Sequence, residues 1–203
     1  MRRLASFAIC LAVLLCFAPQ GFPAQFARPD EDVTKGNWDD SNGNNNDILY
    51  DDIDEVTPDD NDYIESPDDP SSEECEIGLG SLTDPESSSG HYVRYRWQAP
   101  ESGGGQPASI DFTVKLMEGA TQRASWLLQP DPPTTWATTE QTLTAEEANS
   151  ITDYANLRLR FLANKTGGAR TTRIEVSWGE MEVPVASVAP NCATGSSFFG
   201  INL

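Results

Sequence analysis

Hydrophobic and polar residues alternate in several segments of the chain, and a period of two residues is typical of half-buried β-strands. Four segments show it most clearly: residues 93–97, 110–116, 157–161 and 174–178. In the second of these, Ile110, Phe112 and Val114 alternate with polar neighbours. Shorter stretches of the same kind are residues 49–53, 75–79, 124–128 and 181–185.

Stretches rich in glycine, proline and serine separate these segments, as in residues 101–105 and 164–168. A short helix is expected near residues 145–151, because Thr144 and Glu147 have the spacing of a capping box. About eight strands joined by such turns indicate an all-β fold. The prediction is a single β-sandwich or jelly roll with one short connecting helix.

The composition divides the chain into four parts. Residues 1–24 have a basic start, an apolar run of 15 residues and then small residues, which is typical of a signal peptide. The run is shorter than the ~20 residues of a membrane-spanning helix, although an uncleaved N-terminal anchor is an alternative. Residues 25–46 are polar and acidic, which predicts a flexible leader in which Trp38 is the exception. Residues 47–186 form the predicted sandwich, and residues 187–203 form a C-terminal tail.

This organisation predicts a secreted protein, extracellular or periplasmic, with no membrane span once the signal is removed. Only Cys75 and Cys192 remain after the signal segment. In an oxidising compartment, two cysteines predict one disulfide that ties the start of the domain to its tail. Two unpaired thiols are the alternative.

The acidic residues are concentrated in the first third of the chain. The formal net charge is −19, and residues 30–76 contain 19 acidic side chains against one basic residue, Lys35. Such a charge repels phosphate groups, so it argues against nucleic acid and against anionic membrane surfaces as partners.

Six aspartates of this acidic region are candidate metal ligands: Asp51, Asp52, Asp54, Asp59, Asp60 and Asp62. Carboxylate oxygens are the ligands that calcium takes, so a structural calcium ion is one expectation, and no other cofactor is predicted. Their order does not match an EF-hand loop. The alternatives are a solvated acidic face and carboxylates that cap turns.

Recognisable catalytic motifs are missing from the sequence. The single histidine, His91, has no serine or cysteine motif near it and is interpreted as a surface residue of a strand. Neither a phosphate-binding loop nor the ligand spacing of a zinc site occurs. Two carboxylates would suffice for a small glycoside hydrolase, but abundant acidic residues do not identify such a pair. The sequence therefore predicts a protein that is not an enzyme.

Exposed aromatic rings are the candidate ligand-binding groups, since flat rings stack on the faces of sugars. Trp136 lies in a proline-rich loop, and Tyr92 stands at the start of a predicted strand. Trp97 and Trp178 lie on the apolar sides of their strands and are expected in the core. A carbohydrate-binding module with a glycan ligand is therefore one functional hypothesis.

Residues 49–55 and 59–64 resemble the opening of a module found in bacteriophage tail and virion-associated proteins. Trp136 and residues 151–161 resemble the later half of that module, so the resemblance covers roughly residues 38–185. It implies a β-sandwich used as a structural or attachment unit, with no catalytic residues to carry over. Phage virion proteins do not ordinarily carry a secretory signal, which favours a cellular, exported relative of the module.

The leading hypothesis is an exported structural or assembly module of the cell envelope or of an extracellular appendage. Such a module acts through protein partners or self-assembly. In one version, the acidic leader pairs with the sheet edge of a neighbouring subunit. The alternative is the carbohydrate-binding module, followed by a phage tail component and a small glycoside hydrolase.

Overall fold

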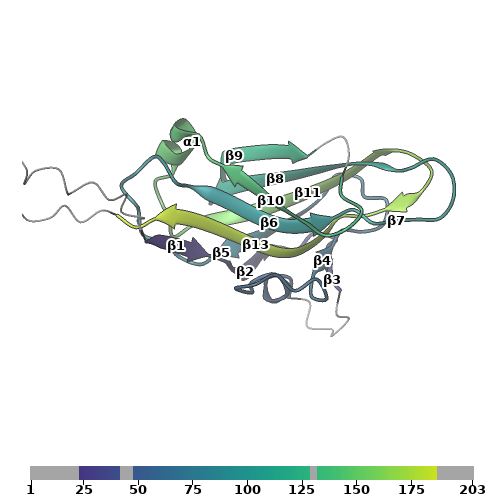
Figure 1. Ribbon diagram of the computed structural model, residues 1–203, viewed down its shortest axis with the longest axis horizontal. Helices are drawn as coiled ribbons and strands as arrows, with labels where there is room; N and C mark the ends of the chain where they lie inside the picture. The colour runs from purple at the N-terminus through teal and green to yellow at the C-terminus, as the bar shows by residue number, and fades with distance from the viewer. Residues whose placement is uncertain (1–22, 42–47, 129–131, 187–203) are drawn as a thin grey trace, which may run out of the picture.

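Two antiparallel sheets pack face to face in the computed structural model, which describes residues 23–41, 48–128 and 132–186 (Figure 1). This arrangement confirms the predicted all-β sandwich. A single short helix and a single 3-10 turn accompany the strands within the described residues: α1 (Ala145–Ser150) and η1 (Tyr50–Asp52). None of the helices in the described part of the chain has the length and apolar character needed to cross a membrane.

The first sheet has the strand order β10-β6-β13-β4-β3, and β1 also pairs with β13. Its strands are β1 (Ala24–Ala27), β3 (Asp39–Asp40), β4 (Ile64–Glu65), β6 (Tyr92–Gln98), β10 (Ala137–Thr142) and β13 (Glu175–Pro184). β6 pairs along one side of β13, while β4 and β1 pair with the two ends of its other side. Between β4 and β1, the edge of β13 contacts Ile53 instead of a strand: the Ile53 carbonyl oxygen accepts a 3.2 Å hydrogen bond from the Gly179 N–H.

The second sheet has the strand order β2-β5-β11-β8-β9. Its strands are β2 (Pro29–Thr34), β5 (Glu73–Leu79), β8 (Ser109–Glu118), β9 (Thr121–Leu128) and β11 (Leu157–Gly167). Two short strands, β7 (Glu101–Ser102) and β12 (Thr171–Thr172), pair separately.

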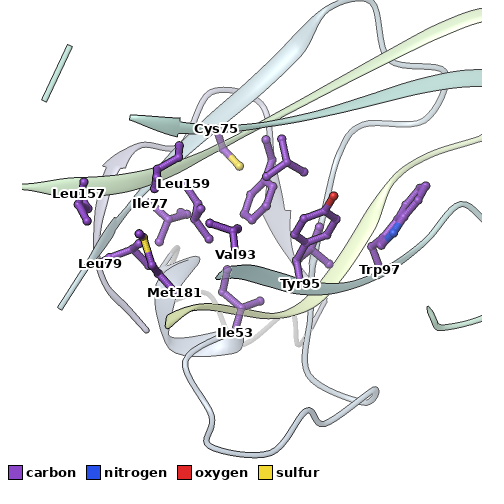
Figure 2. Packing of buried hydrophobic residues seen from close by; sticks show 14 of the residues in the cluster. Ile53, Cys75, Ile77, Leu79, Val93, Tyr95, Trp97, Leu157, Leu159 and Met181 are labelled. Atoms are coloured by element: carbon purple, nitrogen blue, oxygen red, sulfur yellow. The ribbon is translucent and has the colours of Figure 1, made fainter. Parts of the chain in front are cut away.

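The core lies between the sheets and is built from the apolar half of each alternating strand (Figure 2). Phe112 of β8 is its aromatic centre. Its ring centroid lies 4.8 Å from that of Trp97 in β6 and 5.9 Å from that of Phe161 in β11. Side chains from both sheets therefore interlock, and removing them from water supplies the main stabilisation of the fold.

Most of the predicted elements are confirmed. Residues 93–97, 110–116 and 157–161 lie within β6, β8 and β11, and residues 75–79 and 124–128 lie within β5 and β9. The predicted strands 174–178 and 181–185 merge into the single strand β13. The helix is α1, and its capping box is formed by hydrogen bonds in both directions between Thr144 and Glu147.

The predicted strand at residues 49–53 is wrong, because this segment forms the 3-10 turn η1. Leu49 and Ile53, at the two ends of the turn, are both fully buried. The Asp32 carboxylate accepts hydrogen bonds from the backbone N–H groups of Leu49 and Tyr50, each at 2.9 Å. The Asp32 side chain therefore accepts hydrogen bonds from backbone N–H groups that would pair with a neighbouring strand if this segment were itself a strand.

The predicted flexible leader is wrong for its described part, residues 25–41. β1 and β2 pair with β13 and β5, and the Trp38 side chain is only 1% exposed, with its ring 6.3 Å from that of Phe161. The folded unit therefore includes residues 24–41, which precede the predicted start of the domain at residue 47. Composition misled here, because two short edge strands and one buried tryptophan can hold an otherwise polar segment against the domain.

Three predictions concern residues outside the described ranges: the signal segment up to residue 22, the end of the leader and the C-terminal tail. Cys192 belongs to that tail. Its predicted partner Cys75 lies on β5, is fully buried and is a free thiol. Burial raises the pKa of this thiol well above its ordinary value. The Cys75–Cys192 bridge stays a prediction.

Candidate functional site

The outer face of the first sheet carries two adjacent rows of side chains that cross several strands. In the first row, Glu182 of β13 stands between Phe26 of β1 and Tyr92 of β6. In the second row, Arg94 of β6 stands between Glu180 of β13 and Glu140 of β10. Side chains opposite one another on neighbouring strands lie side by side, so the sheet register alone brings these residues together.

The second row forms a continuous ion-pair network. The Arg94 Nε–H donates to Glu140 at 2.7 Å, and its Nη1 lies 3.5 Å from the carboxylate of Glu180. Glu180, whose side chain is 6% exposed, also pairs with Arg28, which follows β1. Burial raises the pKa of Glu180, while the two arginines act in the opposite direction. The network therefore fixes both guanidinium groups against the sheet.

Each aromatic ring of the first row packs against one of these guanidinium groups. The Arg94 guanidinium carbon lies 5.2 Å from the centroid of Tyr92, and that of Arg28 lies 5.8 Å from the centroid of Phe26. Cation–π contacts of this kind hold a ring in place on an exposed surface. Phe26 is 48% exposed, so about half of a large apolar residue faces solvent at a position that the network keeps in place.

A groove of about 380 Å³ opens beside Tyr92. Its lining includes the aromatic, carboxylate and hydroxyl groups of Glu86, Ser87, Ser89, Tyr92 and Glu182, together with apolar residues such as Ala24, Pro85 and Pro184. One side of the groove is formed by the loop of residues 85–90. Gln25 of β1 holds the start of this loop, because its side-chain amide accepts from the Thr83 N–H at 3.0 Å and donates to the Thr83 carbonyl at 2.9 Å. The groove therefore combines an apolar ring with several groups that bind hydroxyls.

Residues 53–63, which follow η1 and form the acidic segment, lie across the outer face of the first sheet. The Trp178 indole N–H donates to the Glu55 carbonyl at 2.7 Å, and the Asp60 carboxylate takes two hydrogen bonds from Arg96 of β6, at 2.5 and 2.7 Å. Ser177 of β13 also donates to Asp60 at 3.2 Å. The hydrogen bonds from Arg96 lower the pKa of Asp60. This segment separates the Tyr92 end of the face from its far end.

Trp136 lies at that far end and is half-buried. Its ring meets the edge of Tyr63 at a centroid distance of 5.5 Å. Since Thr142 pairs with Tyr92 and Ala137 with Trp97, Trp136 lies six residues along β10 from the Tyr92 row, which corresponds to about 20 Å. The structure therefore does not bring the two predicted ligand-binding residues, Trp136 and Tyr92, into one site.

The six predicted calcium ligands play different structural parts. Asp60 pairs with Arg96, Asp59 accepts from the Asn61 side chain at 2.8 Å, and Asp52 is buried in η1. Of the remaining three, Asp54 has a pKa raised by burial, and the charges of Asp51 and Asp62 act in the same direction. Within residues 23–41, 48–128 and 132–186, no three acidic, histidine or cysteine side chains converge as a metal site requires. The calcium ion stays a prediction from the sequence.

Glu55 is the most perturbed carboxyl group of the acidic segment. Burial raises its pKa to about 7, and the charges of Asp62, Asp54 and Asp59 act in the same direction. Its Oε2 atom is buried and has no hydrogen-bond partner among the described groups. Ionised Glu55 is therefore an unfavourable charge beside the outer face.

We expect the Glu55→Gln variant to be more stable than the wild type above pH 7. The folded protein holds the proton of Glu55 up to about pH 7, whereas an unfolded chain loses it near the ordinary glutamate pKa. Wild-type stability should therefore fall between these pH values, and the variant should escape that fall. Allowing for the partial exposure of Glu55, the gain is about 1 kcal/mol. Urea unfolding at pH 5 and pH 8 measures it, and an equal difference at both pH values would contradict the assignment.

His91 is fully buried, so its interpretation as a surface residue is wrong. Its Nε2 lies 2.8 Å from the Tyr154 hydroxyl, and burial lowers the pKa of the imidazole. The pair joins the start of β6 to the loop before β11. Both side chains are buried, and their hydrogen bond stabilises the sandwich.

Sequence reasoning identified Tyr92 but missed Phe26, Arg28, Arg94, Glu180 and Glu182. Phe26 and Arg28 fell within the segment taken for a flexible leader, and β1 pairs with a strand some 150 residues away. One signal was available: the alternation of Tyr92 and Arg94 with buried Val93 and Tyr95 puts both on the outer face. Their partners on β13 and β1 required the sheet register.

Comparison with known proteins gave no matching family model and no matching curated protein. Among solved structures, one similar chain is the CBM22-1 xylan-binding domain of Xyn10C from Paenibacillus barcinonensis. It has 11% identity and a TM-score of 0.34, and the match covers 84% of this chain and all of that domain. Another is the BppUct-A-L tripod from the baseplate of bacteriophage Tuc2009, with 13% identity, a TM-score of 0.35 and coverage of 85% and 66%. These likenesses are too weak to carry an argument.

Proposed function

We propose that the chain is an exported β-sandwich module that binds glycans through the Tyr92 end of its outer face. One observation carries the proposal: Phe26 and Tyr92 flank Glu182 in a single cross-strand row beside a groove of about 380 Å³. Apolar ring faces, carboxylates and hydroxyls in one place are the groups that a sugar needs. Its C–H face packs on a ring, and its hydroxyls bond to charged and polar side chains.

The spacing of the two rings suits an extended ligand. Phe26 and Tyr92 are two strands apart, which corresponds to about 10 Å at the usual spacing of strands. Two linked sugar rings cover a similar length, so each aromatic ring would support one of them. The ion-pair network in the second row keeps both rings in place before a ligand arrives, which reduces the ordering cost of binding.

We expect the Tyr92→Ala and Phe26→Ala variants to lose most glycan binding, each with an affinity drop of about tenfold or more. A glycan array probed with the purified protein measures this directly. Trp136→Ala is the matched control, because this aromatic residue lies on the same face about 20 Å away. An array on which the wild type binds nothing would overturn the proposal, and so would binding that only Trp136→Ala abolishes.

A second candidate function is structural or assembly work in the cell envelope or an extracellular appendage. The observation that favours it is an open sheet edge at β9, where Leu127 is 57% exposed. The described part of the acidic leader does not favour the version in which the leader pairs with a neighbouring subunit. Its strands β1 and β2 pair with β13 and β5 of the same chain.

No catalytic step is part of either proposal. Around Tyr92 on the outer face, the carboxylates of Glu140, Glu180 and Glu182 are all engaged by Arg94. Burial raises the pKa of Glu180, but Arg28 and Arg94 hold its carboxylate in the ion-pair network. The network therefore serves to position side chains in the binding face.

A further inference from the structure

The edges of the two sheets are protected from intermolecular pairing to different degrees. β2 carries Pro29 followed by three acidic residues, and its register shifts twice against β5. β3 is two residues long, and both are aspartates. Proline, charge, short length and irregular register are the devices by which proteins keep sheet edges from pairing with other chains. These edges are therefore blocked.

The edge formed by β9 lacks these devices. This strand has eight residues, with no proline and no carboxylate, and Arg123 is its one charged residue. Among the described strands it pairs only with β8. α1 contacts β9 and lies beside its start (Figure 1), so the part left open is the later half, where Trp126, Leu127 and Leu128 lie.

Leu127 sits on the outer face of the second sheet, opposite Thr113 of β8. Leu127 is 57% exposed. Trp126 and Leu128 face inward and are only partly covered by the core. An exposed, apolar and unprotected edge strand is a ready template for one more strand.

We propose that two copies of this chain associate through β9, whose free edges pair antiparallel about a two-fold axis. The inference deepens the assembly function given above as the second candidate, and it does not depend on glycan binding. Two copies of so acidic a chain repel each other, so they can associate most easily through an edge without carboxylates. In a chain with a formal net charge of −19, β9 itself has no acidic residue, whereas the strongly acidic strands β2 and β3 lie at other edges.

The strand sequence also fits pairing with itself. Residues that lie opposite each other in an antiparallel pair have side chains on the same face of the sheet. In a symmetric pair of β9 strands, the residue at the two-fold axis must therefore lie opposite its own copy. With the axis at Leu127, within the open half of the strand, the two Leu127 side chains would lie beside each other, and Trp126 of one copy would lie beside Leu128 of the other. Apolar side chains would then meet apolar side chains on both faces of the joined sheet, without opposing like charges.

Sedimentation velocity of the purified chain over a concentration series tests the proposal. The expected result is a monomer–dimer equilibrium in the wild type. In the Leu127→Lys variant, two leucines change per dimer, so we expect the dissociation constant to rise by about tenfold or more. Val56→Lys is the matched control, because it replaces another highly exposed apolar residue, 76% exposed, far from β9 in sequence.

A thermal unfolding transition like that of the wild type shows that Leu127→Lys is folded. As a second measurement, the β9 amides of the wild type should exchange hydrogen more slowly as protein concentration rises. A wild type that stays monomeric throughout would overturn the inference and leave the glycan proposal intact. A dimer that persists in Leu127→Lys would overturn pairing through β9 and leave assembly by another surface standing.

Discussion

Replacement of Trp38 by alanine is expected to destabilise the domain by about 3–5 kcal/mol. The side chain is 1% exposed and packs against Phe161, which itself stacks on Phe112 at the centre of the core. Its removal would leave a large cavity between the sheets. The loss would also release the segment between β2 and β3, because no other large apolar side chain holds that segment in the core.

Urea unfolding of Trp38→Ala and the wild type measures this effect. Val56→Ala is a suitable control, since Val56 is 76% exposed and should change stability by no more than about 0.5 kcal/mol. If the Trp38→Ala variant were as stable as the control, the N-terminal segment would not be part of the folded unit, and the Phe26 side of the proposed site would lose its support.

Replacement of Arg94 by methionine is expected to reduce both stability and glycan binding. Arg94 is bonded to Glu140, Glu180 and Glu182 and supports the ring of Tyr92. Methionine keeps the apolar stem but removes the charge, which leaves three carboxylates close together. We expect a stability loss of about 2 kcal/mol at pH 7 and a fall in affinity of about tenfold.

The stability loss should shrink as the pH falls. Burial already raises the pKa of Glu180, and loss of Arg94 removes a charge that lowers it, so the folded variant binds protons more readily than the unfolded chain and gains stability on acidification. Arg158→Met is the matched control. Arg158 is similarly exposed, and it pairs with Glu76 at 2.9 Å on the second sheet. This control should lose stability and keep its affinity, and an equal loss of affinity in both variants would contradict the role of Arg94.

The strands that sequence reasoning found are those in which alternation is strong enough to be read locally. β8 and β6 are examples, with every second residue buried. β10 was missed because its sequence, Ala-Thr-Thr-Glu-Gln-Thr, has no large apolar residue and depends on pairing with β6. β1 and β2 were missed for a related reason: they are held by partners distant in the chain and not by their own composition.

Only one residue of the candidate site could be predicted from the sequence. An outward ring at Tyr92 follows from the period of β6, whereas its neighbours Phe26 and Glu182 follow only from the register of three strands. The aspartate cluster shows the reverse error, since closeness in sequence did not produce convergence. Asp60 turns toward Arg96, while Asp59 bonds to its own turn at Asn61.

Mapping amide chemical shifts during titration with a soluble oligosaccharide that the array identifies tests the central claim most directly. The account predicts that the largest shifts fall on β1, β6 and the end of β13, around Phe26, Tyr92 and Glu182, with little change near Trp136. Shifts centred on Trp136 and Tyr63, or spread over the second sheet, would contradict the binding face that we propose.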